Sequence, residues 1–143
     1  MKSMRNTILF CLVAASLLGC SGGSGDDLHR SILQSDLKRV SYDNGIAMDE
    51  AKIIAEAYLF VYGGKDTGPA PRVYIHDGGT VWLADIASGT AIHPHMAGLP
   101  PVHVSKANGD ITWAHGPSVH RVDLSLAPRK DYFDPSAMPS DAR

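Results

Sequence analysis

The stretch from Ala47 to Tyr62 runs Ala-Met-Asp-Glu-Ala-Lys-Ile-Ile-Ala-Glu-Ala-Tyr-Leu-Phe-Val-Tyr and carries the strongest helical pattern in the chain. Apolar side chains recur there at intervals of three and four residues, which stacks them on one face of an α-helix. The members of this face are Ala51, Ile54, Ala55, Tyr58, Leu59 and Tyr62. Further apolar residues widen the arc, so the helix needs a broad surface to pack against. Because the sequence after it predicts strands, we expect a curved sheet to provide that surface.

Both ends of this helix carry local signals. Asp49 and Glu50 lie in the first turn, where carboxylates suit the positive end of the helix dipole, and Gly63-Gly64 can take the left-handed conformation that closes the last turn. Ala47, however, offers no capping oxygen. Two starts remain open: Glu50 reaches back to cap the backbone, or the helix begins earlier, near Asn44.

Two hairpins are predicted after the helix. In the first, Arg72–His76 and Thr80–Ile86 flank the turn Asp77-Gly78-Gly79, and Trp82 is the large apolar anchor.

The second hairpin is predicted from Pro101–Ser105 and Ile111–Ala114, on either side of Asn108-Gly109. Asn-Gly favours a two-residue turn, and this turn would bring the apolar side chains of both strands to one face. The register that follows from it pairs Lys106 with Ile111, Val104 with Trp113, and Val102 with His115.

The remaining segments complete the expected fold. Ala87 to Pro100 is too irregular for an element, and we expect it to be the most mobile loop. Val122, Leu124 and Leu126 alternate with polar residues, which predicts a last strand within His120 to Leu126. The sequence therefore predicts an α+β domain in which one long N-terminal helix packs against a curved antiparallel sheet of four to five strands.

The N-terminus has the pattern of a secretory leader. Lys2 and Arg5 precede an apolar run from Ile8 to Leu18 that is too short to span a bilayer. The run ends in Leu17-Leu18-Gly19-Cys20, which resembles the lipobox of bacterial lipoproteins. This resemblance implies cleavage after residue 19, lipid attachment at Cys20 and anchoring in a membrane. Ser21 after the cysteine resembles the Gram-negative pattern that permits sorting to the periplasmic face of the outer membrane.

The chain divides into four parts on these signals. Residues 1–19 are the expected signal peptide, 20–45 a lipidated tether, 46–127 the folded domain, and 128–143 a disordered tail. Within the tether, the apolar residues between Leu28 and Val40 allow a short amphipathic helix.

The net charge and the positions of the two cysteines exclude some classes of function. Loss of the leader removes two positive charges from a formal net charge of −2, which disfavours a nucleic-acid partner. Cys11 leaves with the leader and Cys20 takes the lipid, so the folded part has no disulfide and no thiolate metal site.

Titratable side chains give no catalytic pattern. His93-Pro94-His95 could present two imidazoles to a metal, but the sequence supplies no third ligand. The other histidines beyond the tether are His76, His103, His115 and His120. Tyr58 and Asp85 could form an acid-base pair. Tyr58, however, lies on the apolar helix face and is expected in the core, while Asp85 alternates with Trp82 and Ala84 and is expected to face water. We expect no catalytic, cofactor-binding or metal-binding residue, and no enzyme. Trp82 and Trp113 are expected to be core residues.

Several stretches resemble a family of bacterial immunity proteins with a nuclear transport factor 2-like (cystatin-like) fold. The similarity covers about residues 46–117 and contains no catalytic signature. Its pieces are Asp49-Glu50-Ala51-Lys52-Ile53-Ile54-Ala55-Glu56-Ala57, Val61-Tyr62-Gly63, Asp77-Gly78-Gly79-Thr80-Val81-Trp82, and Val102-His103-Val104-Ser105-Lys106 continuing through Asn108-Gly109-Asp110-Ile111 to His115-Gly116.

This resemblance implies an envelope-anchored lipoprotein that binds and neutralises a protein toxin. A helix followed by a Lys-x-x-Gly-x-Ile hairpin is also similar to PepSY domains, which implies as the alternative a lipoprotein that modulates an envelope peptidase or other enzyme. A third reading is a small-ligand-binding or enzymatic member of the same fold. The lipidated leader and the added strand from His120 to Leu126 depart from the family pattern.

Overall fold

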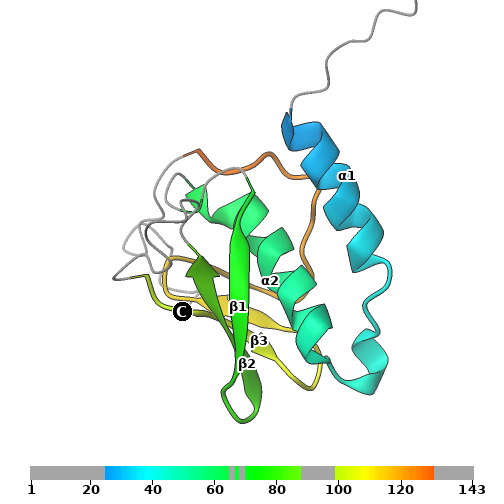
Figure 1. Ribbon diagram of the computed structural model, residues 1–143, viewed down its shortest axis with the longest axis vertical. Helices are drawn as coiled ribbons and strands as arrows, with labels where there is room; N and C mark the ends of the chain where they lie inside the picture. Colours follow the sequence, from blue (N-terminus) through cyan, green and yellow to red (C-terminus); the bar gives the residue numbers. More distant parts are fainter. Residues whose placement is uncertain (1–24, 65–66, 68–69, 88–98, 131–143) are drawn as a thin grey trace, which may run out of the picture.

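The computed structural model of the protein describes residues 25–64, 67, 70–87 and 99–130. Five strands form one antiparallel sheet in the order β1-β2-β3-β4-β5, which confirms the expected α+β class. Figure 1 shows α2 packed against one face of this sheet and α1 beside α2. The elements are α1 (Gly25–Leu37), a 3-10 turn (Tyr42–Asn44), α2 (Met48–Tyr62), β1 (Arg72–Asp77), β2 (Val81–Ala87), β3 (Val102–Ser105), β4 (Ile111–Trp113) and β5 (Gly116–Val119).

The main hydrophobic core lies between α2 and the sheet. Ile54 is 1% exposed and Tyr58 is fully buried, as the helical pattern predicts. The ring of Trp113 from β4 meets Tyr58 edge-on, with 6.2 Å between the ring centroids and an interplanar angle of 88°. Edge-to-face contacts of this kind are a favoured aromatic geometry. The sheet therefore provides the broad surface that the helix requires.

The first of the two starts considered for this helix is the observed one. Glu50 reaches back from the first turn of α2, and its Oε2 accepts a hydrogen bond from the Ala47 backbone N–H at 2.9 Å. Its Oε1 accepts a second one from the Ser41 N–H at 2.7 Å. A single carboxylate thus makes the Glu50 half of a capping box, by accepting from the Ala47 N–H, and fixes the chain that enters the helix, although Ala47 has no side-chain acceptor for the N–H groups of the first turn.

Replacing Glu50 tests this cap directly. Glu50→Ala removes both acceptors, and we expect the free energy of unfolding to fall by about 0.5–2 kcal/mol in urea denaturation. Asp49→Ala is the matched control, because it removes a carboxylate from the same turn and takes away only its interaction with the helix dipole, about 0.3–1 kcal/mol. Equal losses in the two variants would contradict the capping role.

A second helix precedes α2, in the segment where the sequence allowed one. Leu33 of α1 is buried in a smaller core with Phe60 of α2 and Leu124. Arg30 of α1 donates hydrogen bonds to the backbone carbonyls of Leu124 and Leu126, the latter at 3.0 Å. The described part of the chain thus has two α-helices of similar length, α1 with 13 residues and α2 with 15. The helix α1, Gly25–Leu37, thus lies within the stretch 20–45 in which a short helix was allowed.

The register predicted for the second hairpin is wrong by two residues. Val104 lies opposite Ile111, and His103 lies opposite Thr112. The connection is longer than two residues because Ser105 and Asp110 still pair, through a 2.8 Å bond from the Ser105 N–H, and Gly109 N–H bonds to the Ser105 carbonyl at 2.9 Å. A shift of two keeps every side chain on its predicted face, because side chains alternate with a period of two.

The strand predicted within His120 to Leu126 is not formed. Asp123 accepts a hydrogen bond from the Ser125 backbone N–H at 2.9 Å, which bends the chain into a turn. Leu124 is then buried beside α1 and α2 instead of in the sheet. The fifth strand is β5, which pairs with β4 through an irregular register. The first hairpin, in contrast, ends within one residue of its expected bounds.

Several expectations fall on residues that lie outside the described part. They are the signal peptide and Cys20, most of the loop expected between Ala87 and Pro100 with His93 and His95, and most of the tail from Pro128.

Candidate functional site

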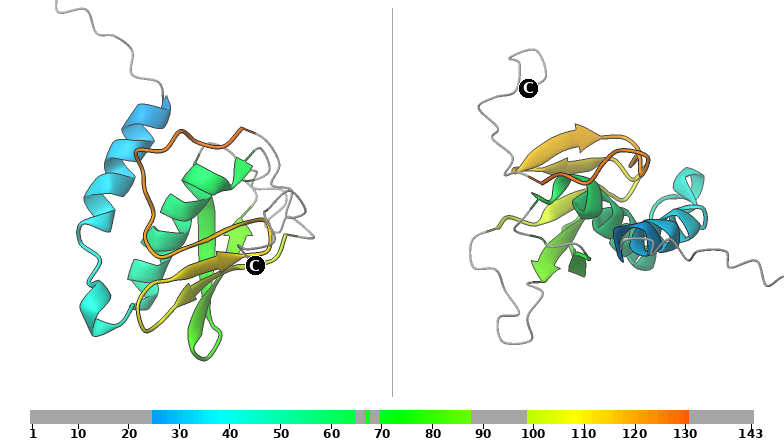
Figure 2. Two further views of the ribbon diagram at one scale, coloured as in Figure 1. Left: turned by 180° about the vertical axis from the view of Figure 1, so that it is seen from behind. Right: turned by 90° about the horizontal axis from the view of Figure 1, so that it is seen from above.

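The face of the sheet turned away from α2 carries a row of polar and aromatic side chains. In the described part of the chain, no helix covers it (Figure 2). Cross-strand pairing places Tyr74 opposite Asp85, and Leu83 between His76 and His103. We call this surface the open face, and its members are Tyr74, His76, Leu83, Asp85, His103 and Thr112.

An ion pair lies at the centre of the β1–β2 part of the open face. His76 Nε2 is 3.0 Å from Asp85 Oδ2, and both side chains remain exposed to solvent. Their attraction is screened by water and is therefore weak as a stabilising contact. Tyr74 stands beside them with 57% of its surface exposed, which is high for a tyrosine on a strand. The open face thus offers an aromatic ring next to a pair of groups that can accept or donate hydrogen bonds.

A cluster of charged and aromatic side chains lies at the end of the sheet where the β1–β2 and β3–β4 turns are found. Lys106 Nζ lies 4.1 Å from the centre of the Trp82 ring and 2.6 Å from Asp77 Oδ1. The hydrogen bond from Lys106 lowers the pKa of Asp77 below its ordinary value, and a bond from the Gly79 N–H adds to this effect. The ammonium group is held between an aromatic face and a carboxylate.

The same end carries a second cation that is fixed from several sides. The Arg121 guanidinium carbon lies 3.4 Å from the centre of the Tyr42 ring, and its Nη1 donates to the Asn108 carbonyl at 2.9 Å. His120 bonds to Asp110, and this contact lowers the pKa of the Asp110 carboxyl group. We call these residues the hairpin-tip cluster: Tyr42, Asp77, Trp82, Lys106, Asn108, Asp110, His120 and Arg121.

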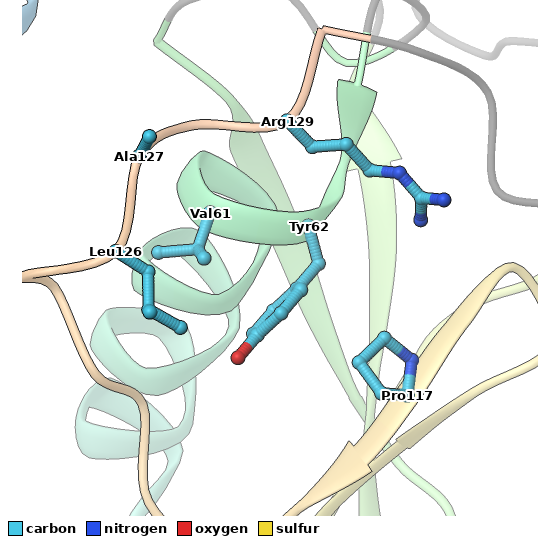
Figure 3. Close-up of a pocket in the computed structure, with 6 residues that line it drawn as sticks. All are labelled: Val61, Tyr62, Pro117, Leu126, Ala127 and Arg129. Carbon is cyan, nitrogen blue, oxygen red and sulfur yellow. The ribbon is translucent and has the colours of Figure 1, made fainter.

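An apolar hollow lies at the opposite end of α2, with a volume of about 390 Å³. Figure 3 shows Val61 and Leu126 on one side, Pro117 of β5 on the other, and the Tyr62 ring between them. Burial raises the pKa of the Tyr62 hydroxyl group above its ordinary value. Its lining is mainly apolar, with Tyr62 and Arg129 as the polar members, so it suits contact with an apolar side chain.

The fold does not bring together Tyr58 and Asp85, the candidate acid-base pair considered from the sequence. Tyr58 lies in the core on the α2 side, where its hydroxyl group donates to the Pro117 carbonyl at 2.7 Å. Burial raises the pKa of this hydroxyl group well above its ordinary value, so it stays protonated. Asp85 is on the open face, on the other side of the sheet. The two groups therefore cannot share a proton or a substrate.

The tryptophans differ in how deeply they are buried. Trp113 is 8% exposed, and its indole N–H donates to the Pro100 carbonyl at 2.9 Å, as expected for a core residue. Trp82 is only half-buried, although its N–H bonds to the Ile46 carbonyl at 2.7 Å. Its ring is part of the hairpin-tip cluster as well as of the core. No local pattern predicted this double role, because the partner Lys106 is distant along the chain.

The described residues contain neither a metal-binding group of side chains nor a helix able to span a membrane. Among them, no set of three or more His, Cys, Asp or Glu side chains is grouped closely enough to bind a metal ion. Within the same residues, no helix combines the length and the apolar character needed to cross a membrane.

The open face and the hairpin-tip cluster are thus the surfaces on which a functional assignment depends. Comparison of the chain with protein-family models, with curated proteins and with solved structures found no match.

Proposed function

We propose that this chain is an envelope-anchored lipoprotein that binds a protein toxin and neutralises it. The observation that carries the proposal is the open face, a sheet surface with an exposed tyrosine and two histidines that α2 supports from behind. The resemblance of residues 46–117 to immunity proteins and the lipobox-like sequence before Cys20 give the class of partner and the place of action. We assign the helix and sheet to a nuclear transport factor 2-like fold as part of the same proposal.

The filled interior favours binding at the surface. In enzymatic or small-ligand-binding members of such a fold, the ligand would lie between the helix and the sheet. Here Tyr58 and Trp113 occupy that space, and Gly116 of β5 approaches so closely that a Cβ atom on it would lie 2.2 Å from the Tyr58 hydroxyl oxygen. A rigid sheet with exposed aromatic and charged side chains suits a protein partner, because such residues supply most of the binding energy in protein interfaces.

Neutralisation can be tested with effectors produced in the same cell. Secreted proteins encoded beside this chain would be exported to the periplasm one at a time, with and without the chain, and growth would be followed. We expect one of them to arrest growth and the chain to restore it. The purified pair should then co-elute, and His103→Ala should weaken their binding, because it truncates an exposed side chain of the open face that lies on β3, and truncated side chains that anchor an interface cost more than about 1 kcal/mol.

The alternatives give different results in the same experiment. A neighbouring peptidase whose activity changes on binding the chain would support the PepSY-like reading instead. If no neighbour is toxic or bound, and a small molecule raises the melting temperature of the purified chain, the toxin-binding proposal is wrong.

The membrane anchor is tested separately. Radiolabelled palmitate should be incorporated into the wild-type chain and lost in Cys20→Ala, and the variant should leave the membrane fraction. Cys11→Ala is the matched control, because Cys11 lies in the expected leader and its loss should leave labelling unchanged. Continued membrane attachment of Cys20→Ala would contradict lipid anchoring.

A further inference from the structure

The outer edge of β1 has hydrogen-bonding groups that no described residue uses. The Val73 backbone N–H points away from β2, because it donates to Glu56 Oε1 at 3.3 Å. N–H and C=O directions alternate along a strand, so those of Ile75 and Asp77 point to the same outer side. In the described part of the chain, no bond reaches these four groups from outside. Among the described residues, these four groups form a short free edge suited to another strand.

The opposite edge of the sheet, β5, is protected from pairing with another strand. β5 spans only Gly116–Val119, its register with β4 is irregular, and Pro117 lacks a backbone N–H. Short, irregular and proline-containing strands are the usual protection against unwanted pairing. β1, in contrast, has six residues in regular register, and among the described residues the Glu56 carboxylate at Val73 is the group bonded to its outer edge.

The position of Glu56 limits the registers in which another strand can pair with the outer edge of β1. Glu56 is held on α2 and keeps the Val73 N–H occupied, so a partner strand must use Ile75 and Asp77. An antiparallel strand related by a two-fold axis through His76 does this: Ile75 pairs with Asp77 of the second copy, and Asp77 with Ile75. Four backbone hydrogen bonds form, and Val73 is left with its carboxylate. Registers centred on Tyr74 or Ile75 would require the Val73 N–H.

The side chains on the open face fit the same register. Tyr74 comes opposite Gly78 of the second copy, which has no side chain to obstruct the ring. Leu83 lies against Gly78, since a Cβ there would be 2.7 Å from Leu83 Cγ, so the ring also gains an apolar surface. An aromatic ring over a glycine on a neighbouring strand is a stabilising arrangement in sheets. The exposed Tyr74 would therefore be covered in both copies.

From this match we infer that two copies of the chain pair antiparallel through the free edge of β1, with His76 at the two-fold axis, to form one continuous ten-strand sheet. The strand that occupies the edge is a second copy of β1. In this register the backbone groups of one copy pair with those of the other, and the Tyr74–Gly78 contact forms twice, once in each direction. The inference does not depend on toxin binding. It places a symmetric open face, twice as wide, on the dimer.

A disulfide placed on the axis tests the register. Residues 76 of the two copies form a non-hydrogen-bonded pair, whose Cα atoms lie about 4.5 Å apart, within the range of disulfides. The chain from residue 21 onward contains both hydrophobic cores and no cysteine of its own. We expect His76→Cys in this chain to form a covalent dimer under mild oxidation. Thr112→Cys, on the same face but on β4, is the matched control and should stay monomeric.

Self-association without a cross-link is the second measurement. Sedimentation equilibrium at concentrations up to the order of 1 mM, where weak contacts become populated, should show a reversible monomer–dimer equilibrium. Tyr74→Lys should weaken it roughly tenfold, because both copies of the tyrosine contact are lost, while Thr112→Lys should not. Circular dichroism would verify that the variants fold. A chain that remains monomeric throughout, or equal cross-linking at positions 76 and 112, would overturn the inference.

Discussion

Trp113→Ala is expected to lower the free energy of unfolding by about 3–5 kcal/mol, one of the two largest effects of a single substitution in this chain. The indole ring is almost fully buried at the centre of the main core. Its removal leaves a cavity beside Tyr58 and takes away the hydrogen bond to the Pro100 carbonyl. A cavity in a packed core loses both the transfer free energy of the removed atoms and the contacts of its lining.

Thr112→Ala is the control for this substitution. Thr112 is the neighbouring residue on β4, but its side chain lies on the open face and is exposed. Its loss should change the stability by no more than about 0.5 kcal/mol. Both variants would be followed by urea denaturation with circular dichroism. A loss below about 1 kcal/mol in Trp113→Ala would mean that Trp113 is not a core residue.

Gly116→Ala is expected to destabilise the fold by about 1–3 kcal/mol through overpacking. The added methyl group would lie 2.2 Å from the Tyr58 hydroxyl oxygen and 3.0 Å from Trp113 Cε3. Neither ring can move away easily, because Tyr58 is tied to Pro117 and Trp113 to Pro100. Gly25→Ala is a suitable control, since no atom lies within 4 Å of the Cβ position there. Thermal and urea unfolding would measure both.

A double-mutant cycle identifies the cause of the Gly116 effect. Tyr58→Phe alone should cost about 1 kcal/mol, because the hydrogen bond to the Pro117 carbonyl is lost. It also removes the oxygen atom with which the new methyl group collides. Gly116→Ala should therefore cost less in the Tyr58→Phe background than in the wild type, with a coupling of about 0.5–3 kcal/mol. Strict additivity of the two substitutions would exclude a clash with the hydroxyl group.

The elements that the sequence predicted are those with strong local signals. α2 follows from its apolar spacing, and β1 and β2 follow from alternation on either side of a glycine turn. β5 was missed because Gly116, Pro117 and Ser118 have low strand propensity, and tertiary packing against Tyr58 decides their conformation. In contrast, Val122–Leu126 alternates like a strand, but the side chain of Asp123 forms a local turn.

The hairpin-tip cluster was harder to predict than the open face, for a physical reason. The open face follows from alternation, because every second residue of a strand lies on the same side. The hairpin-tip cluster depends on pairs far apart in the sequence, such as Arg121 with Tyr42, and on a hairpin register that the sequence placed two residues away. The packing of α1 depends likewise on Arg30 and the distant carbonyl groups of Leu124 and Leu126. No local sequence pattern predicts such long-range contacts.

The attachment of α1 has a mechanical consequence. A pulling force that enters the described chain at Gly25 acts first on α1, which is fastened through Arg30 to the backbone near Leu124 and through Leu33 to α2. Tension applied at Gly25 would therefore have to break the contacts of α1 with Leu124 and with α2 before it could act on the strands of the sheet.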